Sequence, residues 1–111
     1  MVYNREFLTG TMNVLILSLL GERPMHVFEI LQEAERRSAR RFQLREGTIY
    51  PALRQMERGG LLEAEWREGE TERLRKYYGL TLKGRRVAES KRAQWDAISA
   101  AMRMILEGSP G

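Results

Sequence analysis

The stretch from Arg45 to Gly60 constrains the fold most strongly, because it combines a helical apolar stripe with signals for both helix ends. Four apolar side chains recur at spacings of three and four, as a core-facing helix requires: Ile49, Ala52, Leu53 and Met56. We expect Thr48 to cap the N-terminus, which would place Pro51 in the first turn. Gly59 and Gly60 are expected to end the helix.

The opposite face of this helix carries aromatic, basic and amide side chains, among them Tyr50, Arg54 and Gln55. Such a face suits insertion into a DNA groove. The alternative is an ordinary amphipathic helix whose outer face is solvated. The segments on either side of the helix decide between these two interpretations.

Composition indicates one domain of a soluble protein, since the chain has 111 residues, 42% of them apolar and 31% charged. Nineteen basic against 15 acidic side chains give a formal charge of +4, a mild bias towards an anionic partner. The absence of cysteine excludes a disulfide framework and a thiolate metal site. The longest apolar run, Val14 to Leu20, is too short to cross a membrane and lacks a signal-peptide context, so we expect a cytoplasmic protein.

Two helices are expected before this stretch. The first is capped by Thr11 after a lead-in over residues 1–9, and it ends before Gly21 and Pro24. Its surface is apolar on nearly every side, which indicates that a second chain covers part of it.

The second helix runs from about Met25 to Arg37 and ends in a basic cluster. That cluster either stabilises the helix C-terminus or faces phosphates: Arg36, Arg37, Arg40 and Arg41. The single histidine, His26, is expected to make a structural hydrogen bond, because no partner metal ligands stand near it.

A β-hairpin is expected after the Arg45–Gly60 helix, because residues 61–66 and 73–80 alternate between apolar and polar side chains around a charged turn at 67–72. The first strand is expected to be half-buried, with Leu62, Ala64 and Trp66 on one side. Helix, turn, helix and hairpin is the order of a winged helix-turn-helix, a mainly α fold with a small β-hairpin. In that fold the third helix enters the major groove and the hairpin reaches the backbone or minor groove.

The last helix is predicted from Thr81 to about Glu107 and has a heptad-like apolar seam. The seam contains Ala88, Lys91, Trp95, Ile98, Met102 and Ile105. We expect its second half to pack against the same helix and the first helix (Leu15, Leu19) of a second subunit. The alternative is that it folds back over its own domain. In the dimeric interpretation, residues 1–80 form the winged helix-turn-helix, and residues 81–111 form the long C-terminal dimerisation helix and a short tail.

Several strings resemble the PadR family of transcriptional regulators over about Phe7 to Leu106, in its short subgroup with a single C-terminal helix. They are Glu46–Leu53 with Glu57–Leu62, Arg75–Thr81 with Gly84, Gly10–Thr11, and Pro24 with His26, Glu29 and Ile30. The resemblance implies a homodimeric repressor that binds a palindromic operator in double-stranded DNA. An enzyme is not expected, because the sequence has no Ser-His-Asp grouping, no phosphate-cradling glycine loop and no metal-ligand cluster, and no cofactor, metal or membrane partner is expected. The alternative is a dimeric winged-helix protein-interaction module.

The resemblance also implies site residues. On the recognition helix the DNA-facing residues would be Arg45, Thr48, Tyr50 and Arg54, and on the wing Arg73, Arg75 and Lys76. At least one of the two wing tyrosines should be core, and we favour Tyr78 over Tyr77. Trp95 would either stack on a planar small-molecule effector at the dimer centre or simply pack the interface.

The chain departs from the family pattern at two places. Val27 stands where the family usually has glycine, which is expected to alter packing at the start of the second helix. The wing tip, residues 68–72, carries three carboxylates where relatives tend to be glycine-rich or basic. Phosphates would repel these carboxylates, so the tip is expected to point away from DNA or to contribute little affinity.

Overall fold

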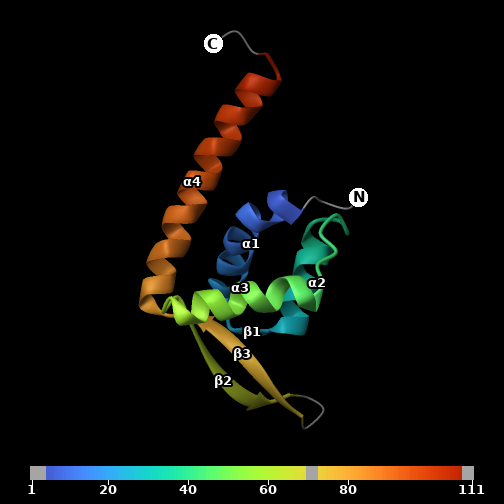
Figure 1. The fold of residues 1–111 in the computed structure, drawn as a ribbon, viewed down its shortest axis with the longest axis vertical. Helices are drawn as coiled ribbons and strands as arrows, with labels where there is room; N and C mark the ends of the chain where they lie inside the picture. Colours follow the sequence, from blue (N-terminus) through green and yellow to red (C-terminus); the bar gives the residue numbers. More distant parts are fainter. Residues whose placement is uncertain (1–4, 70–72, 109–111) are drawn as a thin grey trace.

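The computed structural model describes residues 5–69 and 73–108 and shows a winged helix-turn-helix with a long C-terminal helix (Figure 1). The fold is mainly α with one small antiparallel sheet. In chain order the elements are α1 (Arg5–Leu20), β1 (Met25–His26), α2 (Val27–Arg37), α3 (Glu46–Arg58), β2 (Leu62–Glu68), β3 (Leu74–Leu80) and α4 (Leu82–Leu106). In the described part of the chain no helix is long and apolar enough to cross a membrane.

The wing is the hairpin of β2 and β3, which pair in register from Leu62 opposite Leu80 to Glu68 opposite Leu74. β2 extends two residues beyond the predicted strand. A third strand, β1, was not predicted and pairs with β3 at Tyr78 and Tyr77, giving the order β1-β3-β2. The wing is therefore joined through β1 to the start of α2.

The core lies where α1, α2 and α3 meet the base of the sheet. α1 supplies much of it, and between residues 11 and 20 only Ser18 is exposed, as its apolar sequence predicts. The predicted start of this helix at Thr11 is wrong, since α1 begins at Arg5. The Thr9–Gly10–Thr11 segment weakens a helix by only about 1 kcal/mol or less per residue and does not end it.

The apolar stripe of α3 is confirmed, because Ile49, Leu53 and Met56 are buried. Its predicted cap is wrong: the helix begins at Glu46, the N-cap is Arg45 without a side-chain cap bond, and Thr48 lies inside the first turn. Pro51 consequently lies in the second turn, where it deprives the exposed Gly47 carbonyl of its usual helical donor.

The end of α3 is a Schellman motif. The Leu61 amide donates to the Met56 carbonyl at 2.9 Å, and the Gly60 amide donates to the Glu57 carbonyl at 3.1 Å. Gly60 has a φ of 76°, a left-handed conformation that favours glycine.

α4 starts against this same corner between α3 and β2. The Thr81 hydroxyl caps α4 by accepting from the Gly84 amide at 3.0 Å, and it donates to the Gly60 carbonyl at 2.6 Å. The Lys83 ammonium donates to the Gly59 carbonyl at 3.0 Å. The first half of α4 packs on the core through Val87 and Ala88, whereas the second half extends away from the domain (Figure 1).

Candidate nucleic-acid interface

The outer face of α3 carries a stripe formed by Tyr50, Arg54 and Glu57, which recur at spacings of four and three. Tyr50 and Arg54 are exposed. Among the described residues, Arg54 and Arg45 have no acidic partner within ion-pair distance. Both guanidinium groups are therefore available to bind a phosphate or a guanine edge.

The wing cations differ in their environments. Arg73 is exposed, Arg75 is half-buried, and Lys76 lies 3.5 Å from the Glu57 carboxylate on α3. The Lys76 ammonium also lies 5.2 Å from the centre of the Tyr78 ring. Lys76 thus links the wing to the outer stripe of α3, and part of its charge is compensated.

The two wing tyrosines lie on opposite faces of the sheet. Tyr78 is buried in the core, as predicted. Tyr77 is half-buried and packs on the other face between the edge of His26 (5.2 Å between ring centres) and the guanidinium of Arg67 (5.0 Å from the ring centre). Tyr77 therefore has a packing role where β1 meets the wing.

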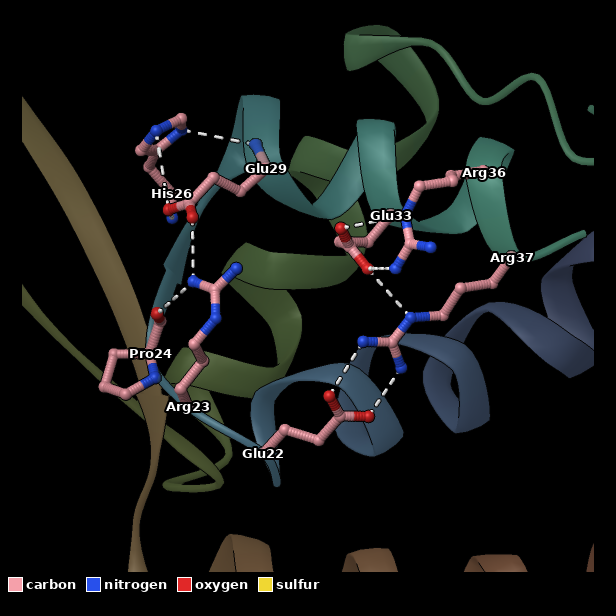
Figure 2. Close-up of polar contacts among 8 residues, drawn as sticks. All are labelled: Glu22, Arg23, Pro24, His26, Glu29, Glu33, Arg36 and Arg37. Carbon is pink, nitrogen blue, oxygen red and sulfur yellow. Dashed lines mark hydrogen bonds and ion pairs between the residues drawn. The ribbon is translucent and has the colours of Figure 1, made fainter.

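The basic cluster at the end of α2 is mainly committed to intramolecular ion pairs (Figure 2). Arg37 binds both oxygens of Glu22, at 2.6 and 2.8 Å, and also Glu33 at 2.8 Å. Arg36 binds Glu33 at 2.8 Å. Hydrogen bonds from Arg36 and Arg37 lower the pKa of Glu33 to about 2. The structure therefore favours the stabilising interpretation for these two arginines.

His26 has the structural role expected for it. Its Nδ1 accepts from the Glu29 amide, and the Glu29 carboxylate accepts from the His26 amide, both at 3.3 Å, which forms a capping box (Figure 2). Arg23 holds the same carboxylate at 2.7 Å. Burial lowers the pKa of His26, so the neutral ring that serves as acceptor is favoured.

The prediction of a half-buried first strand is wrong at its distal end. Leu62 is buried and Ala64 is half-buried, but Trp66 is 65% exposed because the core ends before this residue. Leu74 on β3 is 62% exposed. Glu70 and Glu72 of the predicted acidic tip lie outside the described residues.

The seam of α4 is exposed in its second half, at Trp95, Ile98, Met102 and Ile105. This half does not fold back over its own domain (Figure 1). Of the predicted α1 contacts, Leu15 is half-buried, but Leu19 is only 5% exposed because it belongs to the subunit's own core. Leu19 therefore has almost no exposed surface that a partner subunit could contact.

In the described part of the chain, no group of three or more His, Asp or Glu side chains could hold a metal ion. The histidine is used as a helix cap, and the acidic side chains with short contacts are paired with arginines.

Comparison with known proteins identifies the kind of protein to which this surface belongs. The sequence model of the transcriptional regulator PadR-like family matches residues 16–90. An uncharacterized protein of Lysinibacillus sphaericus is 26% identical over 103 residues, 93% of this chain and 94% of that protein.

Solved structures agree in fold. A PadR family transcription regulator from Clostridium difficile is 33% identical, with a TM-score of 0.73 over 86% of this chain and 98% of that one. One from Eggerthella lenta is 31% identical, with a TM-score of 0.75 over 92% and 87% of the two chains. A PadR-like regulator from Bacillus cereus is 25% identical, with a TM-score of 0.82 over 94% and 99%.

Proposed function

Because the chain belongs to the PadR-like family of transcriptional regulators, we propose that it is a homodimeric repressor that binds a palindromic operator in double-stranded DNA. The observation that carries this proposal is the exposed Tyr50–Arg54 face of α3, which lies beside the wing in a winged helix-turn-helix. Repression by occupying a promoter requires no chemistry.

The recognition helix supplies the base contacts in this proposal. The Tyr50 ring packs on a thymine methyl group while its hydroxyl reaches a phosphate, and Arg54 binds a guanine edge or a phosphate. Thr48 and Arg45, both exposed near the start of α3, bind the backbone together with the wing cations Arg73, Arg75 and Lys76. Of the three wing cations only Arg73 is exposed, since Arg75 is half-buried and Lys76 is paired with Glu57.

The dimer in this proposal forms through the exposed seam of α4, with Leu15 of α1 at its edge. The seam offers apolar surface that a lone subunit would leave in water. A two-fold dimer then presents two α3 helices to major grooves one helical turn apart, about 34 Å. Residues 1–80 read the DNA in this arrangement, and residues 81–111 form the dimerisation element.

A planar effector at the dimer centre is a finer part of the same proposal. Trp95 is 43% exposed within the seam, so two indole rings from the two subunits are available to stack on a flat aromatic guest. Titration with planar aromatic cations while tryptophan emission is followed tests this part. It is refuted if no compound alters the emission while Trp95→Ala still weakens dimerisation.

The proposed DNA binding is tested on duplexes selected from a random pool by the wild-type protein. Tyr50→Ala and Arg54→Ala should each weaken binding about 5- to 100-fold, as loss of one good base contact does. Arg103→Ala, an exposed arginine near the far end of α4, is the matched control and should bind as wild type. Failure to select any duplex, or unchanged affinity of both α3 variants, would refute the proposal and favour a protein-interaction module.

A further inference from the structure

Trp66 and Leu74 form an exposed apolar patch on the wing, which we call the wing patch. Trp66 pairs with Lys76 and Glu68 pairs with Leu74, so Trp66 and Leu74 are diagonal neighbours on one face of the hairpin. They are 65% and 62% exposed. The same face is buried nearer the core, at Leu62 and Tyr78, so the patch continues the apolar face beyond the point where α3 covers it.

The wing patch adjoins the outer face of the recognition helix. Lys76, directly opposite Trp66, reaches the Glu57 carboxylate at 3.5 Å. Glu57 belongs to the same stripe of α3 as Tyr50 and Arg54. The Lys76–Glu57 pair therefore joins the two surfaces, and a partner lying along Tyr50 and Arg54 also meets the wing patch.

We propose that the wing binds DNA through this apolar patch, with the Trp66 indole packed against sugars and base edges of the minor groove. The inference rests on the proposed function. Arg73 and Arg75 alternate with Leu74 along β3 and so project from the other face of the hairpin, towards the phosphates of the groove wall. The face of the patch carries Glu68 and Lys76, and Lys76 is paired with Glu57, so this face offers no unpaired cation to a phosphate and its apolar side chains suit uncharged sugars and base edges. Apolar side chains of minor-groove proteins make such contacts and can wedge between base steps.

Tryptophan emission gives a direct test, because the chain contains only two tryptophans. In Trp95→Phe, Trp66 is the sole reporter, and saturation with the selected duplex should shift its emission and protect it from acrylamide at least about 2-fold. Size-exclusion chromatography confirms that this variant keeps the wild-type oligomeric state.

Affinity measurements test the energetic contribution. Trp66→Ala should weaken binding about 5- to 50-fold, in the range of lost aromatic packing on nucleic acid, and Leu74→Ala about 2- to 5-fold. Because an apolar contact releases no counterions, Trp66→Ala should leave the salt slope unchanged, whereas Arg73→Ala should reduce it by about 1. Met104→Ala, which truncates a similarly exposed (58%) apolar residue on α4, should bind as wild type. Thermal unfolding verifies that each variant folds.

The inference is overturned if Trp66 emission does not change at saturating duplex and Trp66→Ala binds as wild type, while Tyr50→Ala binds more weakly. The proposed DNA binding would then stand. It is also overturned if the Trp66 emission shifts with protein concentration alone, since a second copy would then cover the patch. Absence of binding to any duplex would instead refute the proposed function.

Discussion

Gly84, the third residue of α4, cannot accept a side chain without moving the helix. A β-carbon at this position would lie 3.0 Å from the carbonyl carbon of Leu61 and closer still to its oxygen. These are backbone atoms at the junction of α3 and β2, so they cannot rotate away as a flexible side chain would. Gly84→Ala must therefore push the start of α4 off this corner and strain the bond between the Thr81 hydroxyl and the Gly60 carbonyl.

The expected net effect is a loss of about 2 kcal/mol in the free energy of unfolding. Overpacking of this kind costs about 1–3 kcal/mol. Loss of the Thr81 bond costs about 1 kcal/mol more. Replacing glycine by alanine inside a helix stabilises the helix by about 1 kcal/mol, which offsets part of this loss.

Urea denaturation followed by circular dichroism, at one fixed protein concentration, measures this difference. Gly47→Ala is the matched control, because Gly47 is also helical but has no atom within 4 Å of the added β-carbon. The free energy of unfolding of Gly47→Ala should exceed that of the wild type by about 0.5–1 kcal/mol. If Gly84→Ala proves as stable as the wild type, the corner does not hold α4 in the way described.

Three further predictions concern the caps and the seam. Gly60→Ala should cost about 1–2 kcal/mol in the same denaturation assay, because alanine is strained at a φ of 76°; unchanged stability would contradict the Schellman geometry. Burial lowers the pKa of His26 from 6.5, so the folded state binds its proton less readily than the unfolded chain. The stability that His26 contributes is therefore present above pH 6.5 and lost as the pH falls through the lowered pKa, and His26→Ala should remove this component of the pH profile. Ile98→Asp places a charge in the α4 seam and should shift sedimentation equilibrium towards the monomer, with the far-UV spectrum unchanged because Ile98 is exposed in the subunit; an unaltered dimer would exclude this seam as the interface.

The elements with strong periodicity could be predicted from the sequence. The stripe of α3, the alternation of the hairpin and the seam of α4 each repeat over several turns or residue pairs, so the signal is local and redundant. Tyr78 could be assigned to the core for the same reason.

Features that depend on a single residue or on distant partners could not be predicted. β1 is only two residues long and exists because Met25 and His26 meet β3, more than 50 positions further along the chain. The start of α3 at Glu46 gives no local cap signal, since Arg45 makes no side-chain cap bond.

The exposure of Trp66 and the contacts of the wing cations could not be predicted from the sequence. Alternation places Trp66 on the core side of its strand but cannot say where the core ends. The Lys76–Glu57 contact joins a strand to a helix, and its spacing in sequence carries no periodic signal. Exposure of Tyr50 and Arg54, in contrast, follows directly from the helical period.

α4 is held along its first two turns, at Gly84 and through Val87 and Ala88, and the rest of the helix is a long lever. The part from Ala88 to Leu106 spans ~27 Å, so a tilt of about 5° at its base moves the far end by ~2 Å. In the proposed dimer, joined through the second halves of the two α4 helices, the same tilt would change the distance between the two α3 helices by a comparable length. A ligand or a substitution near that interface would then need only a slight angular change to move both α3 helices out of register with the helical repeat of the duplex.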